Sequence, residues 1–222
     1  MNHIPFDLQI INALAALLLL LSFSMLSQRR IVSLVNLLAM QGLLLTVATL
    51  MVAWRTGETH LYLSGLLTFA LKVVFLPWLL HRLIRRLNVY WDTEPLLNIP
   101  GTMLVGVLIV VFAFGLAQPI AELASTATRN AIGIAVAVIL LSFLMMITRS
   151  KAMSQVVGFL SMENGLFFGA MSATYGMPMV VELGIALDVL VAMLVLGVFF
   201  FQIREQFDSL DLHHLESLKE RD

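Results

Sequence analysis

Hydrophobic residues dominate this chain in long runs that polar residues hardly interrupt. A helix needs about 20 apolar residues to cross the hydrocarbon core of a bilayer. Runs of about that length fall at residues 7–27, 31–53, 61–84, 101–119, 130–148, 152–174 and 178–203. We therefore predict an all-α integral membrane protein of about seven transmembrane helices.

The short segments between these runs carry most of the basic residues, and their distribution indicates an orientation. If the N-terminus lies outside, the outer segments hold only Arg55 and Arg129. The cytoplasmic segments then hold Arg29, Arg30, Arg82, Arg85, Arg86, Arg149, Lys151, Arg204, Lys219 and Arg221. Because cytoplasmic loops of membrane proteins are enriched in Lys and Arg, this sorting predicts an N-out, C-in topology with an odd number of spans.

Composition agrees with a membrane protein and narrows the function classes. Of the 222 residues, 60% are hydrophobic and only 12% are charged, whereas a soluble domain carries about a quarter charged residues. The formal net charge of −1 offers no case for nucleic-acid binding. The absence of cysteine excludes disulfides, cysteine-ligated iron–sulfur clusters and thiolate-ligated zinc. No phosphate loop, nucleophile elbow or metalloprotease helix is present, so we predict no cofactor, no metal and no catalytic site.

Short matches between the two ends of the chain indicate an internal repeat. The matched segments are Leu20-Leu21-Ser22-Phe23 with Leu140-Leu141-Ser142-Phe143, and Ala70-Leu71-Lys72-Val73 with Ala186-Leu187-Asp188-Val189. Gln41 then falls under Glu163, and Lys72 under Asp188. Helices one to three thus resemble a diverged copy of helices five to seven, a three-helix pseudo-repeat, and transporters often place their site between such repeats.

These patterns divide the chain into four parts. We predict an N-terminal three-helix unit (1–86), a loop and linking helix (87–129), a second three-helix unit (130–203) and a cytoplasmic tail (204–222). In the tail, Phe207, Leu210, Leu215 and Leu218 recur at helical spacing between charges. The tail is therefore expected to be an amphipathic helix, either on the membrane surface or docked on a partner.

Three ionisable residues lie near the middle of predicted spans: Lys72, Glu163 and Asp188. A charged group at that depth costs roughly 2.5–3.5 kcal/mol on insertion scales, so the three should pair with one another or face internal water. Burial disfavours a charge while an opposite charge favours it, and this opposition lets a group change protonation near neutral pH, as a proton relay requires. A buried pair that only fixes helix register is the alternative.

Two further residues are weaker candidates for the same ion pathway. Glu182 lies about one turn inside the seventh run and could reach the outer interface. His81, near the cytoplasmic end of the third run, could relay protons, although a lone interfacial histidine is more often structural.

The residues around Glu163 and Asp188 resemble a known family. Residues 130–206 resemble the three-helix K subunit of respiratory complex I and the C subunit of multisubunit Na⁺/H⁺ antiporters. The resemblance rests on the segment from Thr148 to Gly165, which contains Val157-Gly158-Phe159-Leu160-Ser161-Met162-Glu163-Asn164-Gly165, and on Ala186-Leu187-Asp188. Aligned on Gly158, the first membrane glutamate of that family falls on Leu160, one helical turn before Glu163, and the second best matches Asp188.

The longer chain, with its extra N-terminal helices and the Ala70-Leu71-Lys72…Pro77 segment, resembles the hydrogenase-4 component E family. That resemblance implies a non-catalytic membrane subunit of a redox-driven proton- or sodium-pumping complex in a bacterial inner membrane. Its expected partners are antiporter-like and quinone-module-like membrane subunits and the lipid bilayer. A structural scaffold or a stand-alone secondary transporter remain the alternatives, and the identity of the ion stays open.

Overall fold

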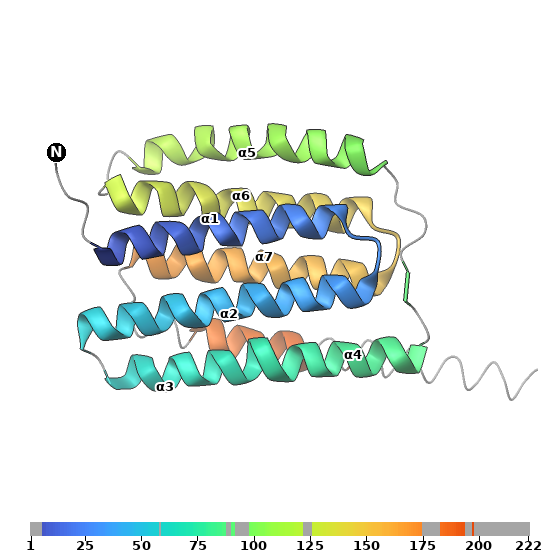
Figure 1. Cartoon of the computed structure of the whole chain (residues 1–222), viewed down its shortest axis with the longest axis horizontal. Helices are drawn as coiled ribbons and strands as arrows, with labels where there is room; N and C mark the ends of the chain where they lie inside the picture. The colour runs from blue at the N-terminus through green and yellow to red at the C-terminus, as the bar shows by residue number, and fades with distance from the viewer. Residues whose placement is uncertain are drawn as a thin grey trace, which may run out of the picture.

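The computed structural model describes residues 6–57, 59–87, 90–91, 98–121, 126–174, 183–193 and 197, and these fold as a bundle of long helices (Figure 1). The helices are α1 (Phe6–Ser27), α2 (Ile31–Thr56), α3 (Thr59–Thr68), η1 (Phe69–Phe75), α4 (Leu76–Leu87), α5 (Ile99–Ala121), α6 (Thr126–Thr148) and α7 (Ala152–Ala173). A shorter apolar helix, Leu183–Met193, follows α7.

The predicted all-α membrane architecture is confirmed. α3, η1 and α4 join end to end in one span, Thr59–Leu87, so the described residues contain six helices long and apolar enough to cross a bilayer. Each predicted run among the first six ends within about one helical turn of the observed helix. Of the seventh run, 178–203, the structure describes mainly Leu183–Met193. Glu182 and the tail from 204 to 222 lie outside the described residues.

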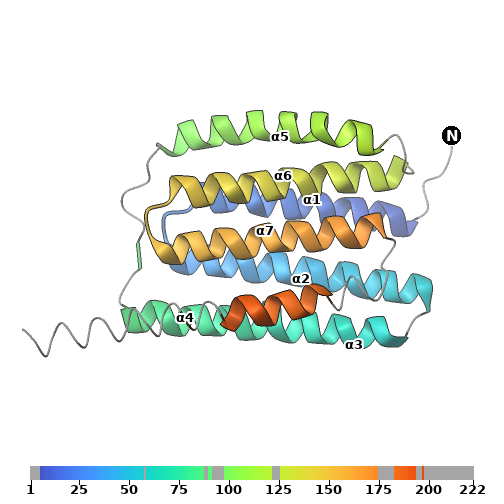
Figure 2. The same ribbon diagram turned by 180° about the vertical axis from the view of Figure 1, so that it is seen from behind.

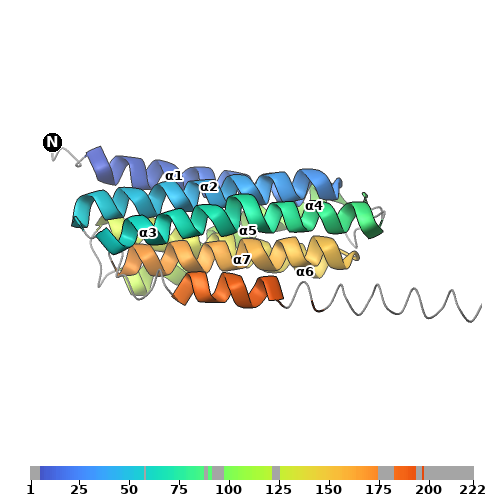
Figure 3. The same cartoon turned by 90° about the horizontal axis from the view of Figure 1, so that it is seen from below.

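The spans lie nearly parallel, and each runs opposite to the one before it (Figures 1 and 3). α2 packs against α1, α7 and the third span, while α6 packs against α1, α5 and α7. α5 forms one edge of the bundle and the third span forms the other (Figure 1). The Leu183–Met193 helix, orange-red in Figure 2, lies against the middle of the third span.

The buried apolar side chains form two separate clusters, one in each half of the bundle. The cluster toward the basic loops includes Met25, Leu34, Leu38, Leu80, Ile84, Leu141 and Leu160. The cluster toward the opposite end includes Leu14, Leu18, Leu45, Val52, Leu61, Val138 and Phe168. Between the two clusters, α1, α2, η1, α6, α7 and the Leu183–Met193 helix bury polar side chains, so the bundle contains a polar layer at mid-depth.

One end of the bundle collects the basic loops predicted to be cytoplasmic. Arg149 is buried there, and its guanidinium donates to the carbonyl oxygens of Leu26 (2.9 Å) and Gln28 (2.6 Å) at the end of α1. Arg30 lies over the ring of Trp91 at 5.3 Å, and the two residues form an isolated antiparallel bridge. A cation at a helix C-terminus is favourable because the last carbonyls carry partial negative charge.

The third span is interrupted by the π-helical segment η1, which the hydrophobic pattern did not predict. Pro77 explains its position. Proline has no N–H to donate to the carbonyl four residues earlier, that of Val73, and its ring crowds that carbonyl, so the helix widens just before it. The N–H of Leu76 bonds to the carbonyl of Leu71, the i→i−5 pattern of a π-helix. Such widened turns are frequent at functional sites.

Candidate functional site

Lys72 lies on η1, in the polar layer, and its side chain is only 3% exposed. Its ammonium nitrogen donates to Glu163 Oε1 at 2.8 Å and to Asn164 Oδ1 at 2.9 Å, both on α7. It also lies 2.5 Å from Asp188 Oδ1 on the Leu183–Met193 helix. The structure therefore brings together the three ionisable residues that the sequence singled out.

Two close contacts hold Lys72 in this cluster. The ammonium of Lys72 lies 5.7 Å from the centre of the Phe167 ring, a cation–π contact on the same helix as Glu163. Gly42 on α2 faces the backbone of Lys72: a Cβ atom there would lie 2.8 Å from Lys72 Cβ. Only a glycine lets α2 and η1 approach this closely, and small residues serve the same purpose between membrane helices in general.

The two carboxylates have unused acceptor capacity. Glu163 and Asp188 are each about 1% exposed. Within the described part of the chain, Glu163 Oε2 and both Asp188 oxygens accept no hydrogen bond, although Asp188 Oδ1 is within ion-pair distance of Lys72. With all three groups ionised the cluster would carry one net negative charge, which a single proton or monovalent cation would neutralise.

A chain of polar side chains extends the cluster across the bundle. Asn164 Nδ2 donates to Gln41 Oε1 at 3.4 Å, and Gln41 Nε2 donates to Ser22 Oγ at 2.9 Å. Asn164 must present its oxygen to Lys72, because an ammonium has no acceptor, and this leaves its amide group for Gln41. The network thus joins α1, α2, α7, η1 and the Leu183–Met193 helix within one layer.

The two helical hairpins of the predicted repeat carry matching contacts. In the first, Gln41 on α2 bonds to Ser22 on α1; in the second, Ser142 on α6 donates to Ser161 on α7 at 3.0 Å. Each pair is separated by 19 residues, and each α1 or α6 serine also donates to the carbonyl four residues before it. In these contacts Ser22 corresponds to Ser142, but Gln41 corresponds to Ser161 and not to Glu163, under which the sequence match placed it; the three-helix pseudo-repeat stays a prediction.

A small cavity adjoins the ion cluster. Its volume is about 10 Å³, and it is lined by Leu38, Lys72, Leu76, Leu160, Glu163 and Asn164. A volume of that size, with charged groups on its wall, suits one water molecule. Leu160 lines this cavity together with Lys72 and Glu163, as part of its apolar wall.

His81 lies away from this cluster. Its Nδ1 is 2.7 Å from the carbonyl oxygen of Pro77, and because a carbonyl only accepts, Nδ1 carries the hydrogen. The histidine lines a different, larger cavity together with Trp78 and three arginines of α4. The structure does not bring it together with Lys72, and it does not describe Glu182.

Four residues of the site, Asn164, Gln41, Ser22 and Gly42, were not identified as site residues from the sequence. Asn164 gave a signal, since it is a polar residue beside Glu163 in the middle of an apolar run. Gln41 was noticed only as a position in the repeat, and Gly42 gave no signal, because the close approach of two helices is invisible in sequence. In the part of the chain that the structure describes, no three His, Asp or Glu side chains gather as a metal site.

Comparison with known proteins identifies full-length relatives. An uncharacterized protein of Mycobacterium tuberculosis, Rv0085, is 35% identical over 204 residues, which cover 91% of this chain and 93% of that protein. Hydrogenase-4 component E of Escherichia coli K12 is 25% identical over 210 residues, or 95% of this chain and 97% of the relative, and the Shigella flexneri protein of that name gives the same values.

The expected resemblance to hydrogenase-4 component E is thereby confirmed as full-length homology. No protein-family model and no solved structure matches the chain. None of the matches supports the resemblance of residues 130–206 to the complex I K subunit or the antiporter C subunit, and that part stays a prediction.

Proposed function

This chain belongs to the same family as the mycobacterial protein and is homologous along nearly its whole length to hydrogenase-4 component E, and on that premise we propose that it is a non-catalytic membrane subunit of a redox-driven ion pump of hydrogenase-4 type. Antiporter-like and quinone-module-like subunits would be its partners in a bacterial inner membrane. Lys72, Glu163 and Asp188 would form its part of an ion-conducting axis.

The observation that supports an ion-conducting role is the bracketing of Lys72 by two carboxylates at mid-depth of the bundle. A lone lysine would need only one counter-charge. A second carboxylate on another helix creates a site with one excess negative charge, and hence a place for one mobile cation. Buried charges of this kind in membrane spans are expensive and typically mark ion pathways.

The geometry suits transfer of a proton between the two carboxyl groups. Lys72 Nζ is 2.8 Å from Glu163 Oε1 and 2.5 Å from Asp188 Oδ1. The ammonium can donate a proton to one carboxylate, and the resulting amine can accept one from the other carboxyl group. The three side chains come from three separate helices, so a shift of one helix would make or break the connection.

The two apolar clusters lie on either side of the ion cluster and separate it from both membrane faces. Conduction therefore requires a change that admits water along Leu38, Leu76 and Leu160, the apolar lining of the small cavity. We place that change at the π-helical turn around Lys72, because such turns are rare and occur frequently at functional sites.

The experiment replaces Glu163→Gln and Asp188→Asn, separately, in the assembled complex. Redox activity and proton uptake into inverted membrane vesicles are measured together, with Asp188→Glu as the charge-conserving control. We expect proton uptake to fall at least about a hundredfold in each neutral variant, the lower end of the contribution typical of a positioned proton-transfer group. Unchanged uptake in both variants would rule the ion-conducting role out.

A structural scaffold is the second candidate, and the tightness of the cluster favours it. The lysine is held by two short contacts to α7 and one to the last described helix, and the adjoining cavity has room for one water molecule. A scaffold predicts that the volume-matched variants pump normally whenever the complex assembles. Assembly, measured by co-purification of the partner subunits, therefore separates the two functions.

A further inference from the structure

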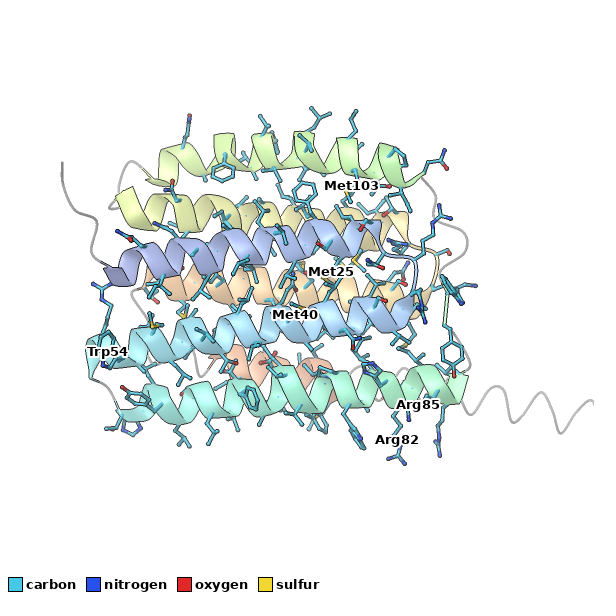
Figure 4. The ribbon with its side chains drawn as sticks, viewed as in Figure 1. Met25, Met40, Trp54, Arg82, Arg85 and Met103 are labelled. Atoms are coloured by element: carbon cyan, nitrogen blue, oxygen red, sulfur yellow. The ribbon has the colours of Figure 1, made fainter. Side chains whose placement is uncertain are left out.

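A second cavity, of about 420 Å³, opens beside α4 at the predicted cytoplasmic end of the third span. Its lining residues are Trp78, His81, Arg82, Arg85 and Arg86. The opposite face of α4 is buried, since Leu79, Leu80, Leu83 and Ile84 belong to the apolar core. The arginines and Trp78 are exposed, and Arg82 and Arg85 project away from the bundle (Figure 4).

The positive charge of this cavity is not balanced within the described part of the chain. No carboxylate among the described residues lies within ion-pair distance of Arg82, Arg85 or Arg86, and Arg82 stacks on Trp78 at 5.4 Å instead. Arginine side chains offer paired N–H donors that match the oxygens of a phosphate. Three of them around one cavity therefore suit a phosphorylated anion.

The surface next to the cavity is apolar, which indicates that the rest of the anion is hydrocarbon. Toward the membrane centre, the exposed side chains are apolar: Val74 is 54% exposed and Phe75 37%, and the Phe75 and Trp78 rings lie 6.4 Å apart. A ligand that follows both surfaces is amphiphilic, with a phosphate at one end and hydrocarbon at the other. Tryptophan at the boundary between them is typical of the headgroup region.

We infer that the cavity lined by Trp78, His81, Arg82, Arg85 and Arg86 is a binding site for an anionic phospholipid of the cytoplasmic leaflet. The phosphate lies among the arginines, and the acyl chains follow Val74 and Phe75 along the third span. Basic pockets at the cytoplasmic side of membrane helices bind such headgroups. The site lies on the same continuous span as Lys72, but the inference is independent of any ion-conducting role.

The test measures lipid binding to the purified full-length chain by native mass spectrometry. Phosphatidylglycerol and phosphatidylcholine of equal chain length are compared in wild type, in Arg82→Gln/Arg85→Gln and in the control Arg29→Gln/Lys151→Gln. The control removes the same number of exposed charges from the same end of the bundle. At about 1 kcal/mol per surface arginine, the cavity variant should bind phosphatidylglycerol roughly 30-fold more weakly, while the control binds it as wild type does.

Four results would overturn the site. Equal affinity of wild type for the two lipids would show that no anionic headgroup is selected, and equal weakening in both variants would show an unspecific charge effect. Displacement of the lipid by excess inorganic phosphate would show a site for a soluble anion. Unchanged lipid binding by the cavity variant, with loss of partner subunits when the same variant is purified as the complex, would show a protein-docking surface. If the glutamine variant does not fold, Arg82→Lys/Arg85→Lys replaces it, and it should bind more weakly than the control.

Discussion

Individual residues in the polar layer have roles that differ with what each side chain touches. Lys72 provides the charge that holds Glu163 and Asp188 together, and Asn164 passes that contact on to Gln41. None of these groups reaches water outside the bundle. In such surroundings, the loss of one partner costs more than the loss of the whole cluster, because the remaining charges keep their desolvation penalty.

Lys72→Met tests this balance. The variant leaves two buried carboxylates without a counter-charge, and the free energy of unfolding in mixed micelles should fall by about 3–5 kcal/mol. The triple variant Lys72→Met/Glu163→Gln/Asp188→Asn has no charge in the layer and should be more stable than the single variant. A single variant as stable as the triple one would contradict the observed ion cluster.

At the scale of helices, the close approach of α2 to η1 positions Lys72. Gly42 gives α2 no side chain at the contact, and Pro77 follows the widened turn that contains Lys72. Glycine at α2 and proline in the third span are unfavourable for helices taken alone. Both residues are explained by the packing of α2 against the third span. Gly42 lets the two backbones meet, and Pro77 turns Lys72 toward α7.

Gly42→Ala should therefore destabilise the protein. The new Cβ would lie 2.8 Å from Lys72 Cβ and 3.1 Å from its carbonyl oxygen, so backbone atoms must move, at a cost of about 1–3 kcal/mol. Gly115→Ala on α5 is the matched control, because a Cβ there meets nothing within 4 Å. The control should be neutral or gain up to about 1 kcal/mol in thermal or denaturant unfolding. Equal effects of the two changes would contradict the observed contact.

The whole molecule is a bundle whose two ends differ strongly in charge. Loops at one end contain Arg29, Arg30, Arg149 and Lys151, and the third span ends there with Arg82, Arg85 and Arg86 (Figure 1). The opposite end carries Arg55 and the exposed Trp54 (Figure 4). Such an asymmetry orients a membrane protein with its basic end in the cytoplasm.

Cysteine labelling tests that orientation, and the chain has no cysteine of its own to interfere. His60→Cys, at the start of α3, should react with a membrane-impermeant maleimide in intact cells because it lies at the outer end. Arg29→Cys, in the turn between α1 and α2, should react only after the membrane is disrupted. The opposite pattern of labelling would show that the bundle is inserted the other way round.

The sequence by itself determined the first six spans and the three central charges, and it predicted the orientation of the bundle. Each of these follows from a local property: a run of apolar residues long enough for the bilayer, the side on which basic residues collect, and the cost of a charge in hydrocarbon. The matched segments also predicted which hairpins correspond. No contact between distant residues is needed for any of these inferences.

Only the tertiary structure decided which groups meet. It showed that Lys72 contacts Glu163, Asn164 and Asp188 at once. It also showed that the missing side chain of Gly42 lets η1 approach α2, and that His81 lines a different cavity. These facts depend on the rotation and depth of each helix in the bundle. Helices with apolar residues on every side carry no stripe that indicates which face is inside, so packing at small and polar residues settles their rotation.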